Sequence, residues 1–135
     1  MNARYEILRT FEGKFFFELY AGGSAPLLIG GERSTLTLCR NSIASVRLIC
    51  GAPLEDVNGY CGDPTPEIPY PKFVVGKNKS RRYVLHLCAK NGKTVAESPG
   101  FVNAAALLTA LANVRRTATF AGVSEKITDS FTRRT

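Results

Sequence analysis

The sequence is poor in the residues on which most enzymatic chemistry depends. Its 135 residues include no tryptophan, one histidine and four cysteines, and the cysteines form no C-x-x-C pair. His86, the single histidine, stands in no catalytic motif, and a lone histidine is a weak candidate for a general base. Paired carboxylates, phosphate-binding loops and dinucleotide fingerprints are also missing. We therefore predict a protein that is not an enzyme and that has no cofactor and no metal site.

Long apolar runs are missing as well. No run approaches the roughly 20 residues that a membrane-spanning helix needs. The first residues lead directly into a strand pattern, without the apolar core of a signal peptide. We expect a cytoplasmic protein that has no contact with a membrane. Its length and its 44% of hydrophobic residues are typical of one globular domain.

The most informative pattern in the sequence is a repeat. When the chain is shifted by 68 residues, its apolar positions coincide without a gap. The matched pairs include Tyr5 with Phe73, Phe17 with Leu85, Ile43 with Leu111, and Val46 with Val114. We interpret residues 1–58 and 72–127 as two repeats within a single domain. A Pro- and Gly-rich linker at 59–71 joins them, and a polar tail at 128–135 follows.

Both repeats predict the same order of elements. In the first, alternating apolar residues predict strands at 5–9, 14–21 and 26–31. Apolar residues at spacings of three and four then predict a helix over 36–50, and a short strand at 54–57 follows. The expected fold is α+β, a tandem duplication of a β-β-β-α-β unit. We expect one joint antiparallel-type sheet with both helices packed on one face and the terminal strands exchanged between repeats.

Two segments of the first repeat, FFFELYA at residues 15–21 and CRNSIASV at 39–46, resemble the YegP-like family of small bacterial proteins. The second repeat adds the Asn-Gly turn at 91–92, SPGF at 98–101 and LANV at 111–114. The resemblance implies tandem repeats, or two subunits, that form a joint sheet with exchanged terminal strands. It implies no established activity, no cofactor and no catalytic residue.

The outward strand faces depart from the family pattern, in which charged or polar residues usually occupy these positions. Here the positions hold Phe16, Glu18 and Tyr20 in the first repeat, and Val84, His86 and Cys88 in the second. Large exposed apolar patches usually mark interfaces. We therefore predict a homodimer interface formed by Phe16, Tyr20, Val84, His86 and Cys88. Cover by the linker or the tail, or a ligand surface, are the alternatives.

The net charge of +7 is distributed unevenly. Residues 1–67 carry 6 Lys and Arg against 8 Asp and Glu, a net charge of −2, whereas residues 68–135 carry 12 against 3, a net charge of +9. Four of these cations, Lys77, Lys79, Arg81 and Arg82, lie in the predicted turn between the first two strands of the second repeat. This turn could contact the phosphates of a nucleic acid or another polyanion, or it could simply be a solvated turn. The sequence thus predicts a self-associating, non-catalytic interaction module, with weak polyanion binding as the alternative.

Overall fold

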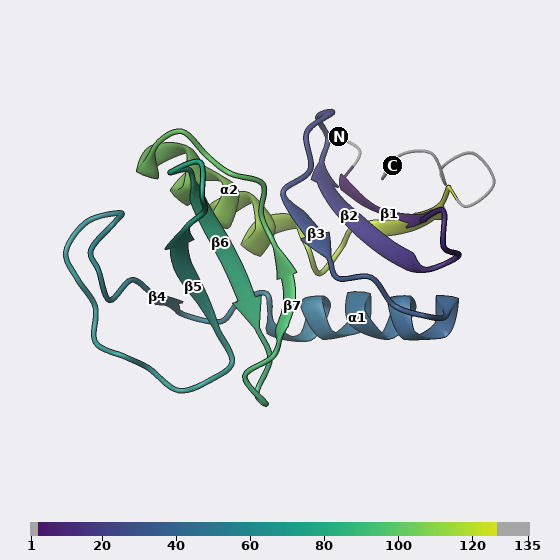
Figure 1. Cartoon of the computed structure of the whole chain (residues 1–135), viewed down its shortest axis with the longest axis horizontal. Coiled ribbons are helices and arrows are strands. Elements are labelled where there is room, and N and C mark those ends of the chain that lie inside the picture. Colours follow the sequence, from purple (N-terminus) through teal and green to yellow (C-terminus); the bar gives the residue numbers. More distant parts are fainter. Residues whose placement is uncertain (1–2, 127–135) are drawn as a thin grey trace.

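The computed structural model, which describes residues 3–126, contains a mixed eight-stranded sheet and two helices (Figure 1). The predicted α+β class is confirmed, and the predicted tail at 128–135 lies outside the described residues. In chain order the elements are β1 (Ala3–Arg9), β2 (Phe15–Ala21), β3 (Leu28–Gly30), α1 (Leu36–Ile49), β4 (Leu54–Glu55), β5 (Lys72–Lys77), β6 (Tyr83–Cys88), β7 (Thr94–Glu97), α2 (Ala104–Thr117) and β8 (Gly122–Glu125).

The strands follow the order β4-β5-β6-β7-β3-β2-β1-β8 across the sheet. Within each half, consecutive strands pair antiparallel, and the two halves meet where β3 pairs antiparallel with β7. The last strand of each half pairs with the first strand of the other half, and both of these pairs, β4 with β5 and β8 with β1, are parallel. The prediction of an antiparallel sheet is therefore wrong at both edges. The linker joins β4 to β5, so it has to bring the chain back along this edge before β5 begins, as a parallel pair requires. At the other edge, β1 and β8 come from opposite ends of the described chain.

Local contacts in the two halves recur at the spacing of 68 residues. Thr35 caps α1 by accepting a hydrogen bond from the backbone N–H of Leu38 at 3.1 Å. Asn103 caps α2 by accepting one from the N–H of Ala106 at 2.8 Å. Such caps satisfy N–H groups that have no partner inside the helix. The backbone bridges Phe15–Arg33 and Tyr83–Phe101 keep the same spacing.

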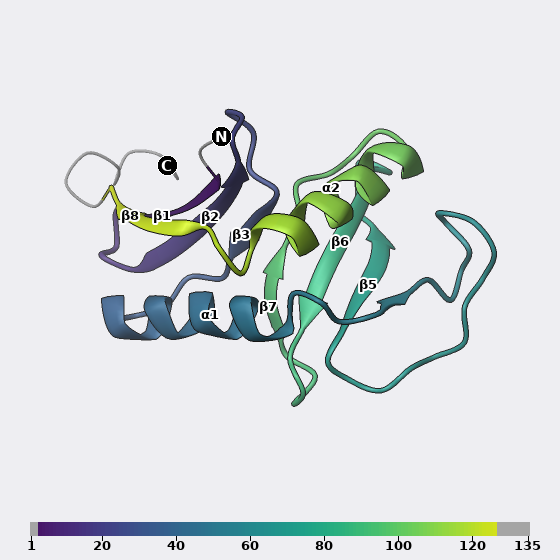
Figure 2. The ribbon, with the colours of Figure 1, turned by 180° about the vertical axis from the view of Figure 1, so that it is seen from behind.

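The hydrophobic core lies between the sheet and the two helices, which cover the same face of the sheet (Figure 2). The side chains that the helices bury include Cys39, Ile43 and Val46 of α1 and Leu107, Leu111 and Val114 of α2. These residues belong to one buried cluster, which also contains strand residues of both halves. The core is therefore continuous across the two halves. On the opposite face of the sheet, which we call the helix-free face, no helix from residues 3–126 is packed.

Two arginines fasten the segments that lead into the edge strands. Arg47 of α1 donates a hydrogen bond to the carbonyl oxygen of Ala121, just before β8, at 2.5 Å. Its guanidinium also lies over the ring of Tyr5 on β1, 5.3 Å from the ring centroid. Arg115 of α2 makes the matching bond to the carbonyl oxygen of Ala52, just before β4, at 2.7 Å. Each helix thus holds the chain that follows the other helix.

The linker after β4 is anchored to the protein by two acidic side chains. The carboxylate of Asp56 accepts hydrogen bonds from the backbone N–H groups of Tyr60 at 2.9 Å and Cys61 at 2.8 Å. Glu55 forms a buried ion pair with Lys72 of β5, with a distance of 2.6 Å between Nζ and Oε1. These contacts connect both ends of the linker to the edge of the sheet.

Candidate binding surfaces

The predicted basic turn forms the tip of the β5–β6 hairpin, and we call this tip the basic hairpin. Its four cations, Lys77, Lys79, Arg81 and Arg82, are all exposed. Asn78 shapes the tip, because its side-chain oxygen accepts hydrogen bonds from the N–H groups of Ser80 at 2.9 Å and Arg82 at 3.0 Å. Arg81 has a φ of 62°, in the left-handed region that favours glycine. The corresponding position of the β1–β2 turn is Gly13, with a φ of 82°.

Aromatic rings border the basic hairpin. The ammonium group of Lys77 lies 4.8 Å from the ring centroid of Tyr83 and 5.0 Å from that of Tyr60 in the linker. The two rings meet edge to face, with their centroids 6.2 Å apart. Cation–π contacts of this kind stabilise a charged side chain without neutralising it. The hairpin therefore combines positive charge with two partly accessible aromatic rings.

The predicted interface residues lie on the helix-free face, but four of the five are buried within the chain. Phe16 has no exposed surface, and Tyr20, Val84 and Cys88 are between 3% and 7% exposed. His86 is half-buried. These four side chains therefore do not form an exposed apolar patch, and the homodimer interface stays a prediction. Cover by the tail, one of the alternatives to a dimer, involves residues outside the described part of the chain.

Neighbouring side chains supply part of this cover. Arg4 stands opposite Tyr20 in the β1–β2 register, and its guanidinium lies 4.4 Å from the centroid of the tyrosine ring. The hydroxyl of Tyr20 donates a hydrogen bond to Glu18 at 2.7 Å, and Nε of Arg4 donates to Glu6 at 2.7 Å. Alternation along a strand assigns a residue to a face. Alternation does not reveal that Arg4 lies over the ring of Tyr20, because that contact depends on the register between β1 and β2.

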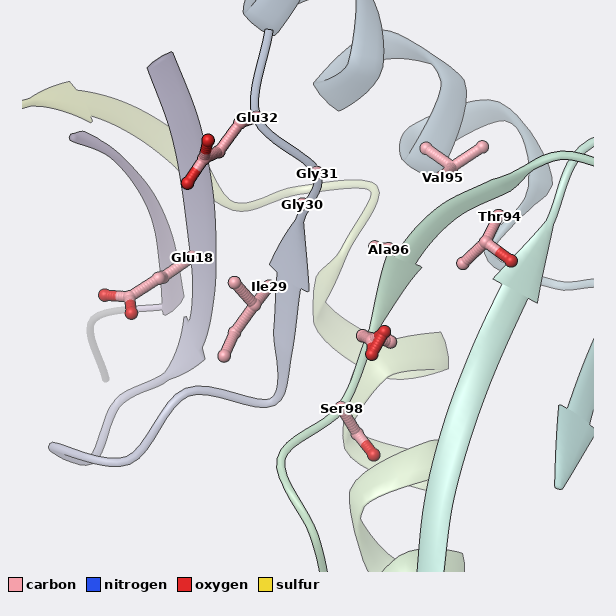
Figure 3. A pocket seen from close by; sticks show the side chains of 10 residues that line it. Glu18, Ile29, Gly30, Gly31, Glu32, Thr94, Val95, Ala96 and Ser98 are labelled. Carbon is pink, nitrogen blue, oxygen red and sulfur yellow. The ribbon is translucent and has the colours of Figure 1, made fainter. Parts of the chain in front are cut away.

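A cavity of about 550 Å³ lies at the junction of the two halves, and we call it the seam groove. The strands β3 and β7 pair here through only two residue pairs, of which Ile29 with Glu97 lies on the helix-free face. Figure 3 shows Glu18 and Ile29 extending from the first half and Ser98 from the second half, with β3 and β7 diverging around the groove. No single stretch of sequence contains these residues, so sequence patterns do not reveal the groove.

The seam groove is acidic. Its lining includes three carboxylates, from Glu18, Glu32 and Glu97, and no lysine or arginine among the described residues. A neighbouring cavity of about 250 Å³ shares Glu97 with it and adds Lys77 and His86. A further cavity that shares Glu32 with the groove adds two cations, Arg33 and Lys93. Within residues 3–126, no three His, Cys, Asp or Glu side chains form a group that could hold a metal ion.

Two of the cysteine thiols, those of Cys39 and Cys61, are poorly suited to nucleophilic chemistry. Burial raises the pKa of the Cys39 thiol to about 11, and the nearby charges of Arg33 and Arg40 only partly oppose this shift. Burial, helped by the charge of Asp56, also raises the pKa of Cys61. The thiolate is the reactive form of cysteine. These two thiols therefore remain protonated at neutral pH.

Two small bacterial proteins share this fold. The structure aligns with the solution NMR structure of yegP from E. coli, a protein of unknown function, with a TM-score of 0.73 and 19% identity over 94% of this chain and 95% of that one. A UPF0339 protein from Shewanella oneidensis aligns over the full length of both chains, with a TM-score of 0.75 and 16% identity. The predicted likeness to the YegP-like proteins is therefore confirmed at the level of the α+β fold.

Comparison of the sequence with models of known protein families gives no match, and neither does comparison with curated proteins. At the identities of the two structural matches, the likeness concerns the fold alone. None of the helices within residues 3–126 is long and apolar enough to span a bilayer.

Proposed function

We propose that this protein is a non-catalytic binding module and that its ligand is a single-stranded polyanion held by the basic hairpin. The observation that carries the proposal is the exposure of four cations on one turn, beside two aromatic rings. Phosphate contacts supply most of the affinity in sequence-independent binding of nucleic acids. Aromatic rings can add stacking with bases, which is worth roughly 1–3 kcal/mol per base.

The backbone of Arg81 supports a functional origin of the charge. A side chain in the left-handed region costs free energy that glycine avoids, and the matching turn of the first half has Gly13 at this position. A residue in a sparsely populated conformation is a reason to suspect function rather than optimal stability. Arginine at this position adds one more cation to the tip, and that is the property a polyanion site requires.

The acidic seam groove limits where the ligand can lie. A polyanion that continued from the basic hairpin along the helix-free face would meet Glu97, which lines both the seam groove and the cavity beside the hairpin. The binding site is therefore short and confined to the outer end of the second half. A short site contacts few phosphates, so the affinity is modest and falls steeply with salt.

Two double variants with equal changes of charge test the proposal. Arg81→Gln/Arg82→Gln alters the basic hairpin, and Lys90→Gln/Lys93→Gln alters the exposed β6–β7 turn. Binding of a fluorescent 12-nucleotide single strand is measured by anisotropy over a range of salt concentrations. If each arginine contacts one phosphate, the slope of log affinity against log salt flattens by about 1.4 in the first variant, since each contact on a single strand contributes about 0.7. The second variant keeps the slope of the wild type.

Equal losses in the two variants would mean that only the overall charge attracts the strand, and would refute a site at the hairpin. No binding by the wild type at low salt would end the polyanion proposal. Lys77 is left unchanged in both variants because its contacts with Tyr60 and Tyr83 also hold the linker.

Self-association is the second candidate function. It is supported by two exposed apolar side chains that lie away from the predicted interface residues. Leu48 near the end of α1 is 85% exposed, and Phe120 in the turn before β8 is 84% exposed. The two segments adjoin, because the Cys50 sulfur lies 3.3 Å from the hydroxyl of Thr119. Light scattering of the wild type and of Leu48→Ser/Phe120→Ser tests this candidate. A dimer that becomes a monomer in the variant supports it, and a monomeric wild type rejects it.

We also infer that the chain arose by tandem duplication and that its edge strands are exchanged between repeats. Recurrence of caps, bridges and arginine contacts at or near the 68-residue spacing supports this inference. If the two repeats diverged after the duplication, the β1–β2 turn and the equivalent β5–β6 turn could bind different ligands. The difference between a glycine turn in the first half and the basic hairpin in the second is consistent with such divergence.

A further inference from the structure

A second groove lies far along the sheet from the basic hairpin, between α1 and the edge strand β8. The cavity has a volume of about 430 Å³, which is within the range of small-molecule sites. Its lining consists of Arg40, Ile43, Ala44 and Arg47 of α1 and Val123 and Glu125 of β8. The spacing of the helix residues places them on one face of α1, and alternate residues of β8 share one face of the strand. We call this cavity the α1–β8 groove.

The α1–β8 groove has apolar walls that remain partly open to solvent. Ile43 is buried at its base, Ala44 is exposed, and Val123 is 45% exposed. Because β8 is the last strand of the sheet, no further strand among the described residues borders this side. An apolar ligand in the groove would remove this surface from water, at roughly 25 cal/mol per Å².

The charges of the groove leave one cation without a carboxylate partner. Arg40 and Glu125 form an ion pair across the groove and neutralise each other. Among the described residues, Arg47 contacts the carbonyl oxygen of Ala121, the face of the Tyr5 ring and the Tyr5 hydroxyl, and none of these is a carboxylate. The Nε atom of Arg47 is buried and has no hydrogen-bond partner in the described part of the chain. A buried donor without a partner is uncommon in folded proteins and calls for an explanation.

Arg115 of α2 corresponds to Arg47 of α1 and can be compared with it directly. Arg115 also donates to a backbone carbonyl, that of Ala52, and lies over an aromatic ring, that of Phe73. Arg115 is exposed, whereas Arg47 is half-buried and lines a cavity. Arg115 makes the same two kinds of contact as Arg47, yet within the described chain it lines no such groove and has no buried nitrogen atom without a partner. The contacts that hold the edge strands therefore do not by themselves explain the groove or the unpartnered Nε atom of Arg47.

We propose that the α1–β8 groove binds a small apolar molecule with a single anionic group, such as an aromatic carboxylate. The carboxylate lies beside Arg47 and accepts a charge-assisted hydrogen bond from its guanidinium, which is stronger than a bond between neutral groups. The apolar body packs against Ile43, Ala44 and Val123. One uncompensated cation matches one negative charge, so a monoanion fits better than a polyanion. This site is separate from the basic hairpin and does not depend on the proposed function.

The probe for this site is benzoate, titrated into the full chain and followed by two-dimensional amide NMR. A ligand of this size is expected to bind with a Kd on the order of 1 mM. We expect saturable shifts confined to the amides of α1 and β8. Benzyl alcohol, which lacks the charge, and acetate, which lacks the apolar body, bind at least about tenfold more weakly, a difference of about 1.4 kcal/mol each.

Three variants complete the test. Ala44→Leu fills the groove at an exposed helix position where leucine is a good helix former, and it abolishes the shifts. Arg47→Lys keeps the charge but removes the planar guanidinium that can form two parallel hydrogen bonds with a carboxylate, and it weakens binding. Arg115→Lys is the matched control, because it changes the same kind of strand contact outside the groove and leaves binding unchanged.

The proposal is overturned if benzoate causes no saturable shifts, or if the shifts lie at the basic hairpin. It is also overturned if Arg115→Lys weakens binding as much as Arg47→Lys, because the effect would then come from loosened edge strands. A dimer that covers the groove and excludes benzoate would assign the surface to a second copy of the chain instead. Nucleic-acid binding is measured on the same samples, and its presence or absence leaves this result unaffected.

Discussion

Replacing Gly30 by alanine tests how tightly the first half packs at the junction of the two halves. Gly30 pairs with Ala96 of β7, so its backbone belongs to the short seam that joins the halves. A Cβ atom at Gly30 would lie 2.1 Å from a ring carbon of Phe17 and within 2.7 Å of two others. Real contacts of this kind are never so short, so either the ring or the strand has to move.

The magnitude of the effect follows from how little freedom the ring has. Phe17 is fully buried and stands edge-on to Tyr5, with the ring centroids 5.7 Å apart. Overpacking of a closely packed core typically costs about 1–3 kcal/mol. For a domain of this length, 1 kcal/mol corresponds to a change in Tm of about 4 °C. We therefore expect Gly30→Ala to lower the Tm by about 4–12 °C, as measured by circular dichroism.

The neighbouring glycine provides a matched control. A Cβ atom at Gly31 would meet no atom within 4 Å, and neither glycine has a positive φ. We expect Gly31→Ala to change the stability by less than about 1 kcal/mol, with a small gain because alanine restricts the unfolded chain. Adding Phe17→Leu to Gly30→Ala is expected to recover part of the loss, with a coupling of about 0.5–3 kcal/mol. Equal effects of the two alanine substitutions, or strict additivity with Phe17→Leu, would refute the reasoning.

Three further predictions concern the shared core and the linker. Ile43→Ala and Leu111→Ala should each destabilise the protein by about 2–5 kcal/mol in urea unfolding, and a loss below about 0.5 kcal/mol at both sites would contradict the helix assignment. The hydrogen bond from Lys72 lowers the pKa of Glu55, so this carboxylate stabilises the fold above its unfolded pKa. Between about pH 6 and pH 3 the wild type should therefore lose more stability than Glu55→Gln, and parallel curves would refute this. Residues 1–62 alone should lack dispersed amide signals, since β1 would lose its partner β8.

The exposed turn was predictable from the sequence, and the buried face was not. A cluster of lysines and arginines between two strand patterns is almost always solvated, because burying four unpaired charges costs far more than a turn can recover. The exposure of Phe16 and Tyr20 depends on what lies above them. For Tyr20 that includes Arg4, which stands opposite it only because β1 and β2 pair in one particular register. Strand alternation contains no information about that neighbour.

The sequence by itself determined the elements, their order and the α+β class. Those features follow from local periodicity and capping, in which each residue interacts with neighbours at most a few positions away. Only the tertiary structure decided the parallel edges, the acidic seam groove and the α1–β8 groove. Each of them joins segments far apart in the chain, as Arg47 and Ala121 show across 74 residues. Contacts at such separations are set by how the two halves of the sheet meet, which no local pattern of residues specifies.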